Sequence, residues 1–236
     1  VRCLPGLYDH RRGPGVILKP APGARRPNAI IFDWDSTLVD NWSAIALALN
    51  ATLTAFGHAP WDNDEVRRRT KKSMRESFPE LFGDLWEEAA ETFYKRFEEF
   101  HLDVVKPMPG AIEIMDLAAG QGVPLAIVSN KNGEYLRREV AHLDWEHRFY
   151  RIIGATDAPV DKPAADPVHM ALAESGVDVG EDVWFVGDSM VDLQCAHASG
   201  CTAVLVETGH ITPEELDLWP PAIRAKSCSE LAERLR

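Results

Sequence analysis

The sequence predicts an α/β protein whose core is a doubly wound parallel sheet, interrupted by an all-helical insertion. From residue 106 onwards, short apolar runs alternate with stretches of helical periodicity, which is typical of parallel strands covered by helices. Residues 41–105 contain helical patterns and no strand-like run. We therefore expect a core made of 29–40 and 106–236, with a separate helical unit at 41–105.

The chain has 236 residues, 45% of them apolar, and a formal net charge of −12. Residues 1–28 are rich in Pro, Gly and Arg and hold six Lys or Arg against one Asp, so we expect a flexible leader outside the fold. The remainder carries a net charge of about −17, which argues against nucleic acid or an anionic membrane as the main partner.

Cysteine usage and hydropathy indicate in which part of the cell the protein is expected. The four cysteines, Cys3, Cys195, Cys201 and Cys228, have no C-x-x-C spacing, so neither a structural zinc site nor a disulfide framework is indicated. No apolar run reaches the roughly 18 residues that a membrane span needs. We expect a cytoplasmic protein with reduced thiols.

The first expected strand is the apolar run 29–32, and the helical insertion follows it. Apolar residues recur at helical spacing over 42–57, ending at a glycine. A second helix, dense in Arg and Lys, is expected over 63–75, and a third with aromatic residues on one face over 84–104.

The remaining elements alternate in type along the chain. The pattern predicts strands at 124–128, 152–153, 183–186 and 202–206, each a short apolar run. Helices are expected between them at 110–119, 133–142, 166–175 and 189–199, most of them ending at or near a glycine.

Polar side chains follow the predicted strands at the point where each ends. Asp33 and Asp35 follow the first strand, Ser129 and Asn130 follow the second, and Lys162 lies in the loop after the third. Asp188, Ser189 and Asp192 follow the fourth. Parallel strands present their carboxyl ends at one edge of the sheet, so these groups are expected to converge there. Taken alone, the two acids of Asp33-Trp-Asp35 are more typical of a solvated turn than of a reactive site.

Such a set suits phosphoryl transfer from a monoester. Carboxylates and a backbone carbonyl suit Mg²⁺, which shields a nucleophile and a phosphate from one another. One Asp can attack phosphorus and a second can exchange the proton of the leaving group. A lysine and a hydroxyl would stabilise the charge on the phosphoryl oxygens.

The motifs together resemble those of the haloacid dehalogenase-like hydrolases. They occur in order as Asp33-Trp-Asp35-Ser-Thr-Leu-Val, Val128-Ser-Asn, Lys162-Pro and Gly187-Asp-Ser-Met-Val-Asp. The resemblance covers about 29–235, and the helices between the first two motifs look like that family's inserted cap. The pattern is similar to the branch of phosphoglycolate phosphatases and β-phosphoglucomutases.

The resemblance implies a role for each charged residue at the sheet edge. Asp33 would be the nucleophile and Asp35 the general acid and base. Mg²⁺ would be held by Asp33, by the backbone carbonyl of Asp35 and by Asp188, with Asp192 as an outer ligand or as the residue that orients Lys162. Lys162 would neutralise the phosphate.

The polar neutral residues also receive roles from the resemblance. Ser129 and the Asn130 amide would hold the phosphate, and Thr37 keeps the hydroxyl expected beside the acids. Ser36 stands where the family usually has Gly, a residue that allows unusual backbone angles.

A basic cluster in the helical insertion offers substrate contacts of a less specific kind. An anionic substrate under a cap would require one or two of its cations, although a solvated helix face explains most of them. Ser73 and Arg75 are the candidates that we expect to contact substrate. The cluster comprises Arg67, Arg68, Arg69, Lys71, Lys72 and Arg75.

The function expected is a Mg²⁺-dependent phosphatase for a small phosphorylated metabolite, with 2-phosphoglycolate implied by resemblance alone. A phosphomutase of the β-phosphoglucomutase type remains an alternative, and a catalytically inactive metal- or phosphate-binding protein is an alternative of another class. Asp35 argues against a dehalogenase and against a phosphonate hydrolase. The sequence does not distinguish a monomer from a homodimer.

Overall fold

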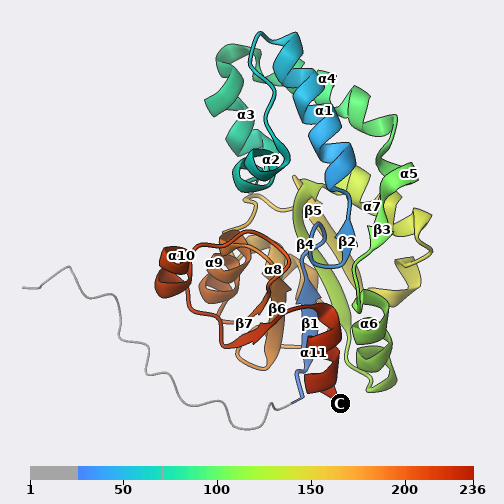
Figure 1. Ribbon diagram of the computed structural model, residues 1–236. Helices are drawn as coiled ribbons and strands as arrows, with labels where there is room; N and C mark the ends of the chain where they lie inside the picture. The colour runs from blue at the N-terminus through green and yellow to red at the C-terminus, as the bar shows by residue number, and fades with distance from the viewer. Residues whose placement is uncertain (1–25, 71) are drawn as a thin grey trace, which may run out of the picture.

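The structure, a computed structural model, describes residues 26–70 and 72–236. The expected leader at 1–28 lies almost wholly outside the described residues, and so do Cys3 and Lys71. Figure 1 shows two layers along the vertical direction, with a sheet and its helices below and a group of helices above.

The core is a six-stranded sheet in which every neighbouring pair is parallel, in the order β5-β4-β1-β6-β7-β8. This confirms the expected fold class. The strands are β1 (Ala29–Phe32), β4 (Leu125–Asn132), β5 (Arg151–Ala155), β6 (Val183–Gly187), β7 (Thr202–Val206) and β8 (Ile223–Ala225).

Helices cover both faces of the sheet, and β1 shows how the sequence makes two cores. Ile30 and Phe32 pack into one buried cluster and Ala29 and Ile31 into the other, because successive side chains of a strand point to opposite faces. The first face carries α6 (Ala111–Gly120), α7 (Gly133–His142) and α11 (Cys228–Leu235), and the second carries α8 (Asp166–Leu172) and α9 (Met190–Ser199).

The order of the strands places a crevice at the end of β1. The chain builds β4 and β5 on one side of β1, then returns to build β6, β7 and β8 on the other side. In open α/β sheets, ligands bind where the strand order reverses in this way, outside the carboxyl ends of the strands.

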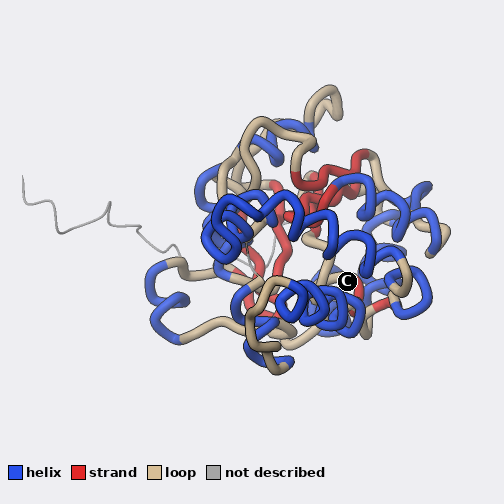
Figure 2. Tube along the Cα trace, turned by 90° about the horizontal axis from the view of Figure 1, so that it is seen from above, coloured by secondary structure: helices blue, strands red, loops and turns tan. Residues whose placement is uncertain are grey.

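Five α-helices, which we call the helical insertion, lie within 41–105 in the described part of the chain. They are α1 (Trp42–Ala55), α2 (Asn63–Arg69), α3 (Met74–Phe82), α4 (Trp86–Glu98) and α5 (His101–Val104). The chain enters through β2 (Val39–Asp40) and leaves through β3 (Lys106–Pro107), which pair antiparallel. Figure 1 places the insertion beyond the ends of β1 and β4, and the view from above in Figure 2 has helices lying across the strands.

Two of the expected helices in the insertion are wrong in extent. The helix expected over 63–75 is two helices, because α2 ends before Thr70, whose hydroxyl bonds back to the carbonyl of Val66 (2.7 Å), and α3 begins after the extended Ser73. The helix expected over 84–104 is interrupted at Phe100, whose backbone leaves the helical region.

Near the C-terminus, α10 (Pro213–Leu218), β8 and α11 extend the core beyond the expected elements. Cys195, Cys201 and Cys228 are free and buried. Among the described residues, no helix combines the length and apolar character needed to cross a membrane.

Candidate active site

The end of β1 positions the two acids in different directions. The backbone amide of Asp33 donates to the carbonyl of Val186 on β6 (2.8 Å), which holds Asp33 at the sheet edge. The chain then turns sharply, since the amide of Leu38 returns to the carbonyl of Trp34 (2.9 Å). Ser36 sits in this turn with a φ of 65°, the left-handed conformation that favours glycine.

Lys162 connects two of the acids that the sequence placed at this edge. Its ammonium donates to Asp33 Oδ1 and to Asp192 Oδ1, both at 2.7 Å, and its side chain is only 3% exposed. Asp192 is fixed in turn, because its Oδ2 accepts hydrogen bonds from the amide (3.0 Å) and the hydroxyl (2.6 Å) of Ser189. Asp192 therefore orients Lys162 and caps the start of α9 at the same time.

Three carboxylates lie close together beside this lysine. Oxygens of Asp33, Asp188 and Asp192 lie within 4.8 Å of one another, and all three residues are buried. Thr37 donates its hydroxyl to Asp188 Oδ1 at 3.3 Å. Gly209 leaves room for Asp188, since a Cβ there would lie 1.8 Å from Asp188 Oδ2. A buried set of carboxylate oxygens is the donor set that hard divalent cations prefer.

The pKa values in this cluster are shifted because like charges lie close together and are buried away from water. Burial raises the pKa of Asp33 to about 6, with Lys162 opposing the rise and Asp192 adding to it. Burial and the charges of Asp192 and Asp33 also raise the pKa of Asp188 well above its usual range. The pKa of Lys162 is raised, because the two carboxylates outweigh its own burial. Lys162 is thus positively charged. A further cation would stabilise the ionised form of the carboxyl groups around it.

Asp35 has a separate environment and a separate cation. Lys131 Nζ donates to Asp35 Oδ1 at 2.9 Å. Burial raises the pKa of Asp35, Lys131 opposes the rise, and nearby Glu139 adds to it. The two acids that follow β1 are therefore paired with two different lysines, Asp33 with Lys162 and Asp35 with Lys131.

Ser129 and Asn130 lie within β4, which continues past the expected end at 128 to Asn132 through an irregular register. The Ser129 hydroxyl accepts from the amide of Lys131 at 3.2 Å. The Asn130 side chain donates to the carbonyl of Lys162 at 3.0 Å, which ties this strand to the lysine loop. Both residues line the same cavity as Asp33, Asp35, Lys162 and Asp188.

That cavity has a volume of about 170 Å³ and lies between the sheet edge and the helical insertion. Its far wall is aromatic, with a few polar groups placed among the rings. The residues of the insertion that line it include Trp42, Arg67, Thr70, Phe78, Phe93, Tyr94 and Phe97. Among the described residues Arg67 makes no ion pair, and its guanidinium lies 5.5 Å from the centre of the Trp42 ring.

Ser73 and Arg75 are placed differently from the other candidates, since neither lines this cavity. Ser73 is buried at the start of α3, and its hydroxyl has no hydrogen-bond partner in the described part of the chain. Arg75 forms an ion pair with Asp161, the residue before Lys162. In this arrangement Arg75 contacts the core and not the cavity.

Sequence reasoning missed Lys131, which forms an ion pair with Asp35, and Glu139, which forms an ion pair with Lys131. The sequence around each of these two residues contains a feature that could have identified it. Lys131 is two residues after Ser129, so an extended strand places the two side chains on one face. Glu139 interrupts the buried face of α7 beside Leu136 and Val140, and a charge at such a position is rarely left unpaired.

The fold and the site together define an α/β protein with clustered charged side chains at the carboxyl ends of parallel strands, where open α/β sheets bind ligands. The chain belongs to the haloacid dehalogenase-like hydrolase family, whose model matches residues 30–206. The family resemblance found in the sequence is thereby confirmed.

Curated relatives and solved structures agree with this membership. The chain is 30% identical over 192 residues to a phosphoglycolate phosphatase of Neisseria meningitidis, covering 77% of this chain and 81% of that protein. It is 28% identical over 191 residues to a phosphoglycolate phosphatase of Chromobacterium violaceum, covering 77% and 86% of the two chains. A haloacid dehalogenase superfamily hydrolase from Ehrlichia chaffeensis is 29% identical with a TM-score of 0.61, covering 89% of this chain and 97% of that one.

Similarity in fold extends to more distant proteins. A haloacid dehalogenase-like hydrolase from Streptococcus pneumoniae superposes with a TM-score of 0.77 at 23% identity, covering 88% of this chain and 98% of that one. At this identity the likeness concerns the fold alone.

Proposed function

We propose that this protein is a Mg²⁺-dependent phosphatase that hydrolyses a small phosphorylated metabolite through a phosphorylated Asp33. The observation that carries the proposal is the position of Lys162, which bridges Asp33 and Asp192 at 2.7 Å beside Asp188. This arrangement keeps one carboxylate oxygen of a buried aspartate next to a fixed cation at the edge where open α/β sheets bind their ligands.

The residues present fit a divalent cation. Asp33 and Asp188 would hold it together with the backbone carbonyl of Asp35, while the oxygens of Asp192 already accept from Lys162 and Ser189. Bound Mg²⁺ would supply positive charge between two anions, the nucleophile and the phosphate.

The protein residues perform the transfer in two halves. In the first, an oxygen of Asp33 bonds to phosphorus, the bond to the ester oxygen breaks, and the leaving oxygen takes a proton from Asp35. In the second, ionised Asp35 takes a proton from water whose oxygen bonds to phosphorus, and the bond between phosphorus and Asp33 breaks. Both carboxyl groups then return to their initial state.

Binding of the phosphate falls to groups that line the cavity. The Ser129 hydroxyl, the Asn130 amide and the Lys162 ammonium are donors that would face the phosphoryl oxygens. Thr37 acts through Asp188, to which it donates its hydroxyl.

The helical insertion would act as the cap that selects the substrate, with the boundaries 29–40 and 106–236 for the core and 41–105 for the cap. The relatives named phosphoglycolate phosphatase make 2-phosphoglycolate the first substrate to test. A cavity of about 170 Å³ accommodates a small metabolite. The acidic net charge of −12 supports such a partner over nucleic acid or an anionic membrane, and a cytoplasmic location is part of this proposal.

A phosphomutase and an inactive binding protein are less well supported. The chain retains both acids that follow β1 and the lysine, which an inactive protein has no reason to keep. The curated relatives cited above carry the name of a phosphatase.

The test is a panel of phosphorylated metabolites incubated with the protein in Mg²⁺ and in EDTA, with free phosphate as the readout. We expect release from at least one small monoester in Mg²⁺ and none in EDTA. No release from any monoester, or release that EDTA leaves unchanged, would overturn the proposal. A sugar bisphosphate that speeds isomerisation without phosphate release would favour the mutase.

A further inference from the structure

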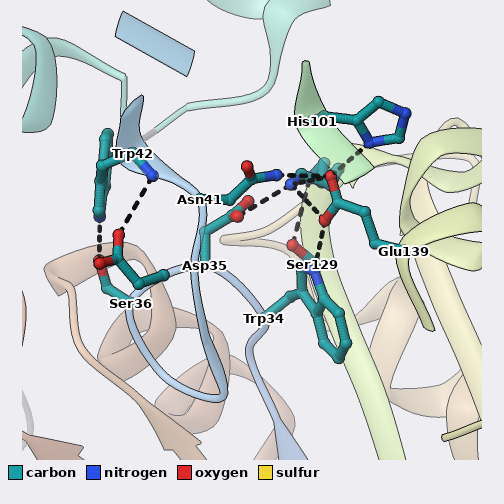
Figure 3. A network of polar contacts seen from close by, with 10 residues as sticks. Trp34, Asp35, Ser36, Asn41, Trp42, His101, Ser129 and Glu139 are labelled. Carbon is teal, nitrogen blue, oxygen red and sulfur yellow. Dashed lines mark hydrogen bonds and ion pairs between the residues drawn. The ribbon is translucent and has the colours of Figure 1, made fainter. Parts of the chain in front are cut away.

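Glu139 is a fully buried carboxylate that accepts hydrogen bonds from four side chains. Trp34 Nε1 donates to its Oε2 at 2.7 Å, and Asn41 Nδ2 donates to its Oε1 at 2.6 Å. His101 Nδ1 lies 2.9 Å from Oε1, and Lys131 Nζ lies 3.0 and 2.8 Å from the two oxygens. Figure 3 shows Trp34, Asn41 and His101 directed at Glu139 from three segments of the chain.

The charges in this network are opposite and matched. Burial of Glu139 opposes its ionisation, but Lys131 and the hydrogen bonds from His101, Lys131 and Trp34 outweigh burial and lower its pKa. The carboxylates of Asp35 and Glu139 raise the pKa of Lys131 against the effect of its burial. Lys131 is therefore an ammonium ion between two carboxylates.

Lys131 lines the cavity but is engaged by two carboxylates. One N–H of Lys131 is directed at Asp35 Oδ1, and the two oxygens of Glu139 lie close enough together to share a second. Its side chain is 7% exposed. The bond to Asp35 is the direct link between Lys131 and the groups assigned to the reaction.

Asp35 is held by one oxygen only. Oδ1 accepts from Lys131, while Oδ2 accepts no hydrogen bond from any residue in the described ranges. A carboxyl group fixed at one oxygen has a defined plane, and its second oxygen is available to carry a proton toward the cavity.

Glu139 is attached to both crossings between the sheet and the helical insertion. Asn41 directly precedes α1, close to where the chain enters the insertion, and His101 begins α5, close to where the chain leaves it. Trp34 lies between the two acids that follow β1. The carboxylate that holds Lys131 is thus fixed by groups whose positions depend on the segments that join the sheet to the helical insertion.

We propose that Lys131 is a positioning residue for Asp35, and that Glu139 fixes Lys131 for this purpose. The inference rests on the proposed function, because it concerns the proton that Asp35 gives to the leaving oxygen. Lys131 fixes Asp35 Oδ1 so that Oδ2 meets that oxygen, and it does not contact the substrate.

The experiment measures kcat/KM for a series of phosphate monoesters with different leaving groups, from 4-nitrophenyl phosphate to alkyl phosphates. A good leaving group departs without a proton, whereas a poor one needs Asp35 in position. For Lys131→Met we expect a loss of about 100-fold with alkyl phosphates and of less than about 10-fold with 4-nitrophenyl phosphate. Glu139→Gln should show the same pattern with smaller losses.

Lys131→Arg keeps the charge and a donor toward Asp35, so it should restore part of the activity toward alkyl phosphates. It also replaces Lys131→Met in the series if that variant fails to fold. Lys95→Met, at an exposed position of α4, is the matched control and should leave the whole series unchanged.

Equal losses for all leaving groups in the Lys131 variants would overturn the proposal, and so would a higher KM with unchanged kcat, which indicates substrate contact. Failure of the proposed function is distinguishable, because the wild-type protein would then release phosphate from no member of the series.

Discussion

Arg75 on α3 of the helical insertion donates a hydrogen bond to the buried carboxylate of Asp161, the residue immediately before Lys162. The other oxygen of Asp161 accepts from the amide of Thr156 at 3.1 Å. One carboxylate therefore joins the insertion to the loop that carries Lys162.

Replacement of Arg75 by Gln should weaken the seating of the insertion over the cavity. We expect KM to rise about tenfold, the equivalent of 1.4 kcal/mol, with a smaller change in kcat. Urea unfolding should show a loss of about 1–3 kcal/mol, because Asp161 stays buried without its cation. Arg234→Gln removes an exposed pair with Glu230 on α11 and should change stability by less than about 0.5 kcal/mol. An unchanged KM would show that the ion pair does not hold the insertion.

The raised pKa of Asp33 predicts how stability depends on pH without metal. A group whose pKa is 3.8 when unfolded and about 6 when folded binds protons on folding, so stability falls as pH rises from about 4 past 6. The effect is on the order of 3 kcal/mol. Asp33→Asn lacks the charge, so in EDTA it should gain stability relative to wild type between pH 4.5 and 7.5. A pH-independent difference in urea unfolding would contradict this.

Ser36 combines an unfavourable backbone conformation with two favourable hydrogen bonds. Its φ of 65° costs about 1–2 kcal/mol for a residue with a side chain, while its hydroxyl accepts from Trp42 Nε1 and its carbonyl accepts from the Thr208 hydroxyl at 2.6 Å. Ser36→Ala loses the contact with Trp42 and keeps the strain, whereas Ser36→Gly loses the contact and relieves the strain. Thermal unfolding should therefore rank Ala below Gly by about 1 kcal/mol. The reverse order would show that the turn is unstrained.

The three clustered carboxylates predict stabilisation by metal. At a Mg²⁺ concentration about 100 times the dissociation constant, binding adds about 2.7 kcal/mol to stability, which raises Tm by about 5–10 °C for a domain of this size. Asp188→Asn removes one of the oxygens and should remove the shift. A wild-type Tm that does not respond to Mg²⁺, or a shift that survives in Asp188→Asn, would mean that these acids do not form the metal site.

The convergence of the charged residues at the sheet edge could be predicted because it depends only on the direction in which the strands run. Asp33, Lys162 and Asp188 follow different parallel strands, and parallel strands end at the same edge whatever their side chains contact. The pairing of Lys162 with Asp192 is one of the two roles for Asp192 that the family resemblance implied.

The surroundings of Asp35 could not be predicted in the same way. Glu139 meets Asn41 and His101, residues 98 and 38 positions away, through the geometry of the two crossings into the insertion. Arg75 has its partner 86 positions away, in a loop whose path no local pattern indicates. Helix α2 ends at Arg69, a break that helical periodicity does not indicate.

The central claim is that Asp33 attacks the phosphate, and Asp33→Asn tests it most directly. The change keeps the size of the side chain and removes the nucleophilic oxygen charge, while Asp84→Asn at an exposed position serves as the control. With Mg²⁺ and the best substrate of the panel, phosphate release by Asp33→Asn should fall at least about a thousandfold, and release by Asp84→Asn should equal that of wild type. Undiminished turnover by folded Asp33→Asn would contradict the account.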